Sequence, residues 1–307
     1  MFLSIVILNW NRPDDTIQAV GSVTRQDFSD YEVIVWDNCS NEASKELLRG
    51  QLENKPRVRL VWGDANYGVA GGRNRSFRLA RGDAIVSLDS DAIFERNDSL
   101  RIIADSLQGD PAIGCISFEV RKPNGHLAWP FARPAGVWKD RTFDTSRCDG
   151  CAFAVRRNVF EQVNGFPEHF SPYGAEDAYF ALSIIGGGYR VLYLPDVKII
   201  HAVTPRARTG AEFTKHVRNH LWMRMELFPF PHAALSASNV AVSLLRDAWE
   251  QGQMGDYAKG IFEAVTGFRT GRRRPLPAAA WRLVRDMVGT ERRLAAEAGA
   301  GAASART

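Results

Sequence analysis

Short apolar runs alternate with amphipathic segments over the first third of the chain. The apolar runs lie at 3–8, 32–36, 58–62 and 84–88. They are apolar at successive positions, as strands buried on both faces of a parallel sheet are. The segments between them carry helix signals, including Pro13 at a helix start and Asn41 in a capping position. This order predicts right-handed βαβ units and an α/β, Rossmann-like, mostly parallel sheet flanked by helices.

The third helix and the fourth show clear end signals. The third follows a glycine-rich start, carries Phe77 and Ala80, and is expected to end at Gly82. The fourth is expected to be capped by Asn97 and to end at Gly109.

Beyond residue 110 the pattern changes from strand–helix units to strands and turns. Strands are predicted at 113–120, 151–156, 189–194 and 197–201. A turn at 123–125 and a stretch rich in Trp and Pro through Trp138 lie between the first two. We expect this region to form one wall of a substrate site and to bind the acceptor of a reaction.

The last third is predicted to be helical, with helices at 212–228, 233–249 and 257–268. The expected organisation is a domain over 1–210, a helical C-terminal extension over 211–297 and a disordered tail over 298–307. Basic residues beside Trp and Phe in the extension suit peripheral contact with an anionic membrane. Packing against the core or a second subunit, as in a homodimer, is the favoured alternative.

Composition excludes several classes of protein. The formal net charge of +4 over 307 residues gives no case for nucleic-acid binding. Four cysteines are too few to frame a secreted fold of this size, and Cys148 and Cys151 have no second ligand pair for zinc. The N-terminal apolar run has no basic segment before it, and no window is long enough to span a bilayer. We therefore expect a cytoplasmic protein, in peripheral contact with the inner face of the membrane if the helical extension binds lipid.

The fourth strand ends on two carboxylates, Asp89 and Asp91, separated by Ser90. Residues two apart in a strand point to the same side, so both carboxylates would lie beyond its C-terminal end. Such a pair suits a hard divalent cation, Mg²⁺ or Mn²⁺, which in turn would hold a diphosphate. An ordinary solvated turn is the alternative.

Three further signals have both a functional and a structural interpretation. The glycine-rich start of the third helix, with Gly68 and Arg73, can approach a phosphate, although its spacing is not that of a dinucleotide-binding motif. Glu176 and Asp177 begin a helix, where acids also favour the helix dipole. His201 ends a strand, and an imidazole there is either structural or a ligand that completes a Mn²⁺ site.

Taken in order, these signals resemble one family. They are Ser4-Ile5-Val6-Ile7 leading to Asn11-Arg12, Val35-Trp36-Asp37-Asn38, Asp89-Ser90-Asp91, and Gly174-Ala175-Glu176-Asp177 with His201 downstream. Over residues 1–225 the chain resembles inverting, family-2-type nucleotide-sugar glycosyltransferases with the GT-A fold, in particular bacterial rhamnosyltransferase-like members. The chain departs from the usual pattern at Cys148-Asp149-Gly150-Cys151, where small residues are more common.

The resemblance implies a role for each candidate residue. Asp37 and Asn38 would bind the pyrimidine base, the backbone around Leu8 and Trp10 would frame the nucleotide, and Arg73 would lie near the diphosphate. Asp91 would ligate the metal, Asp89 would contact the ribose or a metal-bound water, and His201 would be a further metal or phosphate ligand. Asp177 would be the general base, oriented by Glu176. Asn11, Gly68 and Ser90 complete the expected donor-binding set. In the domain over 1–210, the resemblance implies a nucleotide-binding half over 1–110 and an acceptor-binding half over 111–210.

The resemblance implies a Mn²⁺- or Mg²⁺-dependent enzyme. It would move a sugar from a UDP- or dTDP-sugar to a hydroxyl acceptor, such as a lipid-linked cell-surface glycan or a natural product. Two alternatives share the fold: a sugar nucleotidyltransferase and a non-enzymatic nucleotide-sugar-binding protein. The nucleotidyltransferase would be expected to carry a glycine-rich basic loop after the first strand, where this chain has Leu8-Asn9-Trp10-Asn11-Arg12-Pro13.

Overall fold

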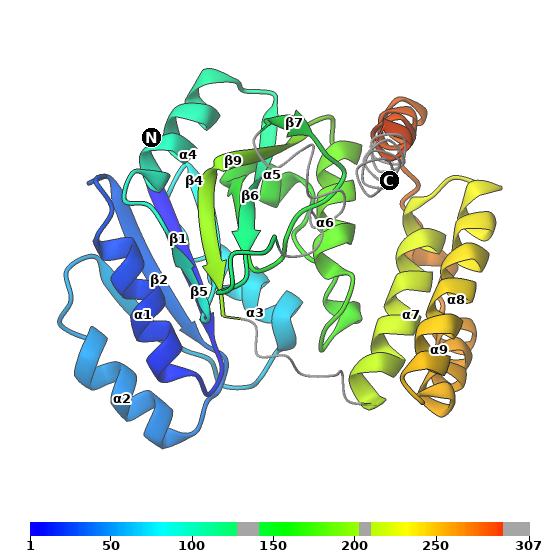
Figure 1. Cartoon of the computed structure of the whole chain (residues 1–307), viewed down its shortest axis with the longest axis horizontal. Coiled ribbons are helices and arrows are strands. Elements are labelled where there is room, and N and C mark those ends of the chain that lie inside the picture. Colours follow the sequence, from blue (N-terminus) through cyan, green and yellow to red (C-terminus); the bar gives the residue numbers. More distant parts are fainter. Residues whose placement is uncertain (128–140, 203–209, 291–307) are drawn as a thin grey trace, which may run out of the picture.

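A computed structural model of the chain describes residues 1–127, 141–202 and 210–290. The predicted stretch through Trp138 and the predicted disordered tail lie outside these residues. In the described part, one nine-stranded sheet forms the centre of the molecule (Figure 1). Its strands are β1 (Leu3–Asn9), β2 (Tyr31–Asp37), β3 (Val58–Trp62), β4 (Ala84–Asp89), β5 (Ala92–Phe94), β6 (Ile113–Arg121), β7 (Phe143–Asp144), β8 (Ala152–Arg156) and β9 (Arg190–His201).

The sheet is mostly parallel, as predicted, with antiparallel strands in its second half. The strand order is β3-β2-β1-β4-β8-β6-β9-β5, and β7 pairs with β9. β1 runs parallel to β2 and β4, whereas β8 is antiparallel to both β4 and β6. The C-terminal ends of β1, β2 and β4 therefore meet at one edge, which is where ligands bind in open α/β sheets.

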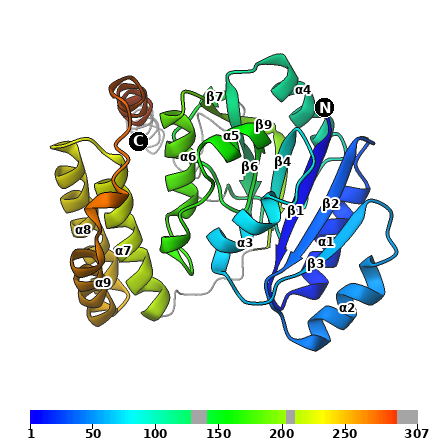
Figure 2. The same ribbon diagram turned by 180° about the vertical axis from the view of Figure 1, so that it is seen from behind.

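Helices cover both faces of the sheet. α1 (Pro13–Thr24), α2 (Glu42–Leu52) and α4 (Ser99–Gly109) lie on one face, and α3 (Gly68–Phe77), α5 (Arg157–Gln162) and α6 (Glu176–Gly186) on the other (Figures 1 and 2). Alternation along β1 explains this division, because Ile5 and Ile7 belong to the core under α1 while Val6 belongs to the core under α3. Phe166 stacks on Phe180 of α6 with ring centroids 4.1 Å apart, in an aromatic cluster that joins α3 and α6.

The C-terminal extension consists of α7 (Gly210–Leu227), α8 (His232–Glu250), α9 (Met254–Gly267), a short 3₁₀ turn η2 (Thr270–Arg272) and a helical segment from 278 to 290. The three predicted helices are thus confirmed. α7 packs against α6, and a second 3₁₀ turn, η1 (Glu168–Phe170), precedes α6. No helix among the described residues is both long and apolar enough to cross a bilayer.

Three predicted boundaries were wrong. α4 is capped by Asp98 rather than Asn97, and no side-chain hydrogen bond closes this cap. α3 ends at Phe77, and the chain turns before it reaches Gly82. The two strands predicted at 189–194 and 197–201 are one strand, β9, which pairs with β6 through a register shift. The polar interruption between them is a local irregularity of that pairing, which no sequence pattern distinguishes from a turn.

Candidate active site

The end of β4 brings the two predicted carboxylates to the sheet edge. β4 ends at Asp89, and the chain turns through Asp91 into β5. β5 pairs antiparallel with β9, with Ala92 opposite His201, and the Ala202 N–H donates to the Asp91 carbonyl oxygen at 2.9 Å. This pairing brings together Asp91 and His201, which lie 110 residues apart in the sequence.

The three predicted metal ligands form one cluster. The ligand atoms of Asp89, Asp91 and His201 all lie within 4.8 Å of one another, and no other such cluster occurs among the described residues. His201 Nε2 lies 3.1 Å from Asp91 Oδ1. Two carboxylates and one imidazole are a donor set that suits Mn²⁺ and also accepts Mg²⁺.

Arg12 contacts the second oxygen of Asp91. Its Nη1 lies 2.5 Å from Asp91 Oδ2, and the Asp91 side chain is 14% exposed. Burial opposes ionisation, but the hydrogen bond with His201 and the charges of His201 and Arg12 hold the pKa of Asp91 below its ordinary value. The carboxylate is therefore ionised and already attracts cationic groups, so the residues present fit a divalent cation. The sequence pointed to Arg12 only as part of a motif and not as a contact of this cluster.

Arg73 connects this cluster to the acidic start of α6. The side chain is 2% exposed, and its Nη2 donates to Asp89 Oδ1 at 2.9 Å and also to the Gly150 carbonyl oxygen. Burial alone would lower the pKa of Arg73, but the charges of Asp89, Glu176 and Asp177 raise it. A buried guanidinium therefore lies between the carboxylates predicted for metal binding and those predicted for catalysis.

The loop at 148–151 fits closely between these groups. A Cβ atom built at Gly150 would lie 3.2 Å from Asp177 Oδ2, so any larger residue would crowd that carboxylate. The Cys151 carbonyl oxygen accepts from the Asp89 N–H at 2.8 Å, and Cys148 and Cys151 are buried free thiols. The glycine within the unusual Cys148-to-Cys151 segment therefore sits where the site needs a small residue.

A tight turn presents the two acids at the start of α6. Gly174 and Ala175 have φ of +110° and +64°, and the Gly174 N–H donates to Glu176 Oε2 at 2.6 Å. Burial, reinforced by the neighbouring charge of Asp177, raises the pKa of Glu176 to about 7. Burial also raises the pKa of Asp177 above its ordinary value. Carboxylates with raised pKa values are better proton acceptors, as a general base must be.

Asn219 of α7 holds this turn in place. It is 0% exposed, and its Nδ2 donates to the carbonyl oxygens of Phe170, Tyr173 and Gly174 at 2.7, 3.1 and 3.0 Å. Its Oδ1 accepts from Arg218 Nε at 2.9 Å. The sequence did not single out Asn219; the available signal was a polar amide within the amphipathic helix, beside its apolar positions.

The predicted nucleotide-binding residues lie at the ends of β1 and β2. Asp37 is 1% exposed, and its oxygens accept from Asn9 Nδ2 at 2.7 Å and from the Ser40 N–H at 2.8 Å. A carboxylate has further acceptor positions, so these two bonds do not use up its capacity to accept. Leu8 is partly buried, whereas Trp10 is 56% exposed just beyond β1.

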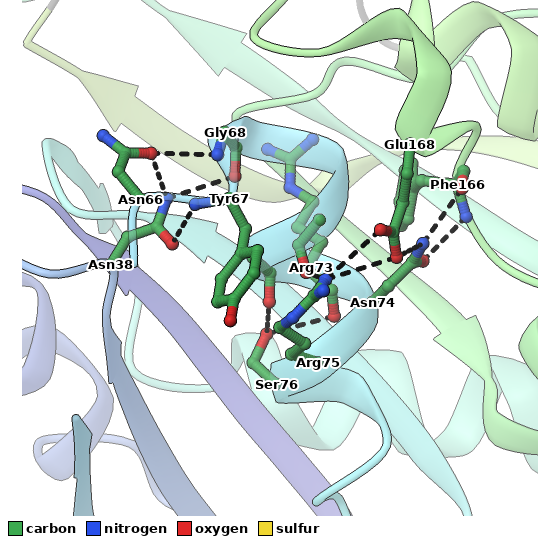
Figure 3. A network of polar contacts seen from close by, with 12 residues as sticks. Asn38, Asn66, Tyr67, Gly68, Arg73, Asn74, Arg75, Ser76, Phe166 and Glu168 are labelled. Carbon is green, nitrogen blue, oxygen red and sulfur yellow. Dashed lines mark hydrogen bonds and ion pairs between the residues drawn. The ribbon is translucent and has the colours of Figure 1, made fainter. Parts of the chain in front are cut away.

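Asn38 ties the end of β2 to the glycine-rich start of α3, as Figure 3 shows. Its Nδ2 donates to Asn66 Oδ1 at 2.8 Å and to the Gly68 carbonyl oxygen at 3.1 Å, and its Oδ1 accepts from the Tyr67 N–H at 3.1 Å. Gly68 has φ of +68°, and a Cβ there would lie 2.8 Å from the Pro172 carbonyl oxygen. This glycine is therefore required by the backbone that packs against it.

Two predicted donor-binding residues shape the same edge. Asn11 has φ of +53°, and its Oδ1 accepts from the Asn41 N–H at 2.9 Å. Ser90 is buried in the turn between the two aspartates. All the predicted residues thus lie around the C-terminal edge of the sheet or on the helices beside it, and their contacts with a nucleotide stay predictions.

Comparison with known proteins agrees with this arrangement. Residues 4–163 match glycosyl transferase family 2, and residues 138–204 match the N-terminal domain of galactosyltransferase. The chain is 36% identical over 89 residues to a putative colanic acid biosynthesis glycosyl transferase, WcaA, of Escherichia coli, covering 29% of this chain and 32% of that protein. It is 28% identical over 192 residues to the O-antigen chain rhamnosyltransferase WbaN of Salmonella anatum, covering 57% of this chain and 58% of that one. The matches thus span about a third to somewhat over half of these relatives.

Solved structures share the fold. The mannosyltransferase PcManGT from Pyrobaculum calidifontis, in complex with GDP-Man and Mn²⁺, superposes with a TM-score of 0.61 at 22% identity, covering 97% of this chain and 84% of that chain. S. aureus TarS 1–349 in complex with UDP-GlcNAc gives 0.61 at 18% identity, covering 87% and 83%. The GT-A fold predicted from the sequence is therefore confirmed. Because residues 4–163, about half of the chain, match the family model, the chain belongs to glycosyl transferase family 2.

Proposed function

We propose that the chain is a metal-dependent inverting glycosyltransferase that moves a sugar from a UDP- or dTDP-sugar to a hydroxyl acceptor. The observation that carries the proposal is buried Arg73, which pairs with Asp89 of the metal cluster and lies beside Asp177. Solved relatives bound to GDP-Man with Mn²⁺ and to UDP-GlcNAc support the donor class. Family membership favours transfer over the nucleotidyltransferase and binding-protein alternatives.

Residues at the C-terminal edge of the sheet would bind the nucleotide-sugar donor. Asp37 and Asn38 bind the base, Leu8 and Trp10 frame the nucleotide, and Arg73 lies near the diphosphate. Asp89, Asp91 and His201 would hold Mn²⁺ or Mg²⁺. When bound, such a cation stabilises the negative charge that gathers on a departing diphosphate.

The acids at the start of α6 would act on the acceptor hydroxyl. Asp177 takes the proton of the attacking hydroxyl, a step that contributes on the order of 10²–10⁴ in rate. Glu176, fixed by the Gly174 N–H, orients Asp177 or the acceptor. Attack on the face opposite the leaving group displaces it in one step and inverts the anomeric centre.

Asp177→Asn tests this assignment. The variant should bind the nucleotide sugar with unchanged affinity and lose transfer by on the order of 10²-fold or more, because an amide cannot accept the proton. The exposed Asp196 gives a matched control, and Asp196→Asn should leave both properties unchanged. An NMR assignment of the product's anomeric configuration tests inversion. Retained turnover in Asp177→Asn would move the base role to another residue.

The relatives in colanic acid and O-antigen synthesis support a surface-polysaccharide role. On the C-terminal helices, Trp249, Phe262 and Val265 are 75%, 67% and 74% exposed. These apolar side chains would contact either a second subunit or an anionic membrane surface. Sedimentation with and without anionic vesicles separates the two, because a homodimer forms in both conditions and a peripheral protein pellets only with vesicles.

A further inference from the structure

A large cavity lies apart from the cluster of Asp89, Asp91 and His201. It has a volume of about 980 Å³, and none of Asp89, Asp91 and His201 lines it. Its walls include residues of α6, among them Tyr179 and Ser183, and the segment 271–277 that precedes the last helix. Figure 2 shows this segment beside α7. We call this cavity the lateral groove.

The carboxylates that line the lateral groove already have partners. Glu168 accepts from Asn74 Nδ2 at 3.0 Å and pairs with Arg75 at 3.3 Å, as Figure 3 shows. Glu226 is 0% exposed and is hydrogen-bonded by His169 Nε2 at 2.9 Å. These acids are therefore engaged in holding η1 and α7 in place.

Three guanidinium groups of the groove have no carboxylate partner. Arg78, Arg272 and Arg274 line it, and no carboxylate among the described residues lies within 4.0 Å of any of them. Arg274 Nη1 donates to the Gly271 and Arg273 carbonyl oxygens, and the Arg272 guanidinium lies over the Trp222 ring. None of these contacts neutralises the positive charge. Arg273 instead holds the end of α7 by donating to the Met225 and Phe228 carbonyl oxygens. The groove thus collects three positive charges that no carboxylate pairs with, and an anion bound in the groove would be attracted to them.

We propose that the lateral groove binds an anionic saccharide through phosphate or carboxylate groups. Guanidinium groups match both oxyanions with paired N–H donors. The volume is at the upper end of the roughly 300–1,000 Å³ typical of small-molecule sites, so it accommodates sugar units as well as the charged group. Ser183 also lines the groove; its hydroxyl donates to the Tyr179 carbonyl oxygen within α6 and keeps lone pairs that can accept from a sugar hydroxyl.

The position of the groove relative to Asp177 gives it a role in binding the acceptor. This role rests on the proposed glycosyl transfer. α6 carries Asp177 in its first turn and Ser183 in the groove, so the two residues lie about 9 Å apart along the helix axis at 1.5 Å per residue. α3 makes the same connection, because Arg73 contacts Asp89 while the next residue, Asn74, lines the groove. The groove would hold a charged part of the acceptor other than the sugar unit that carries the reacting hydroxyl.

Calorimetric titration of the full chain tests the proposal without requiring transfer. The probes are inorganic pyrophosphate, an oligogalacturonate and a neutral malto-oligosaccharide, all in EDTA so that the metal cluster holds no cation. A variant with Arg78, Arg272 and Arg274 replaced by alanine should bind the anionic probes at least tenfold more weakly. The matched control replaces the exposed Arg246, Arg282 and Arg285, which do not line the groove and change the net charge equally.

A second variant guards against misfolding of the triple variant. Ser183→Glu adds a negative charge to the wall of the groove and should strongly weaken binding of the anionic probes. Preference for pyrophosphate would identify a phosphate-bearing chain, and preference for the oligogalacturonate a uronate-bearing one; either result supports the proposal. Equal binding by the groove and control variants, or no binding of either anion by the wild-type chain, would overturn it. A chain that transfers sugar yet binds neither anion refutes the groove alone, whereas anion binding without nucleotide-sugar binding refutes the proposed function alone.

Discussion

Truncation of Asn219 to alanine should damage catalysis from a helix outside the metal cluster. The amide is fully buried and donates to three carbonyl oxygens of the turn that leads into Glu176. The two amide N–H groups share these three acceptors and contribute about 0.5–1.5 kcal/mol each, and leaving buried carbonyl groups unpaired adds about 1–3 kcal/mol. Since the carbonyl groups can find other partners in part, we expect a loss of about 2–4 kcal/mol in the free energy of unfolding.

Loss of catalysis is expected because Asn219 holds the turn that positions Asp177. Gly174 and Ala175 hold left-handed conformations that the surrounding structure must maintain. If the turn relaxes, Asp177 moves, and a displacement of about 1 Å costs on the order of 10²-fold in rate. The donor KM should stay within about twofold, because the metal cluster belongs to the sheet edge formed by β4, β5 and β9.

The assay combines urea unfolding with steady-state transfer kinetics at a temperature where the variant is folded. Asn239→Ala is the matched control, because Asn239 is exposed on α8. The control should keep wild-type stability and kcat. An Asn219→Ala enzyme that loses stability but keeps kcat within twofold would show that α7 does not position the base, and the argument from this turn would then fail.

Three further variants test other parts of the site. Burial raises the pKa of Glu176 from 4.5 to about 7, so its contribution to stability is full below pH 4.5 and is lost as the pH rises through 7. Glu176→Gln should make the decline of stability in urea unfolding between pH 4.5 and 7.5 shallower, with a remainder from Asp149 and Asp177, whose pKa values burial also raises. An unchanged profile would place the titration elsewhere. Arg12 forms a half-exposed ion pair with Asp91 and so competes with a cation for that carboxylate. Arg12→Ala should therefore raise Mn²⁺ affinity by up to about fivefold, measured by calorimetry without nucleotide. Weaker Mn²⁺ binding would instead make Arg12 part of the cation site. Gly165 and Gly188 both have positive φ, but only at Gly165 would a Cβ overlap the Asn74 side chain. Gly165→Ala should therefore destabilise by about 1–3 kcal/mol more than Gly188→Ala, and equal losses would contradict the packing argument.

Local patterns predicted the parts of the site that depend on one strand or one helix. The apolar run ending on Asp89 and Asp91 predicted a strand whose last residues face the sheet edge, and the structure places them there. The acids Glu176 and Asp177 were predicted at a helix start and lie in the first turn of α6. In both cases the neighbours along the chain determine the position of the side chain.

The remaining parts depend on contacts between distant segments. His201 meets Asp91 only because β5 pairs antiparallel with β9, and neither segment specifies that partner by its own sequence. Arg12 reaches the same carboxylate from the start of α1. Motif analysis does not identify Asn219, because this residue acts by donating to three backbone carbonyl groups, which every residue type carries. Packing of α7 on the turn before α6 creates that function.

Thermal unfolding with a panel of UDP-, dTDP- and GDP-sugars, with and without Mn²⁺, tests whether this sheet edge is a metal-dependent donor site. A sugar nucleotide at about a hundred times its Kd should stabilise the chain by roughly 2.7 kcal/mol. We expect that gain for UDP- or dTDP-sugars only with Mn²⁺, lost in Asp91→Ala and kept in the exposed control Asp196→Ala. A gain that is independent of Mn²⁺ and unchanged in Asp91→Ala, or no gain with any sugar nucleotide, would contradict the assignment of this site.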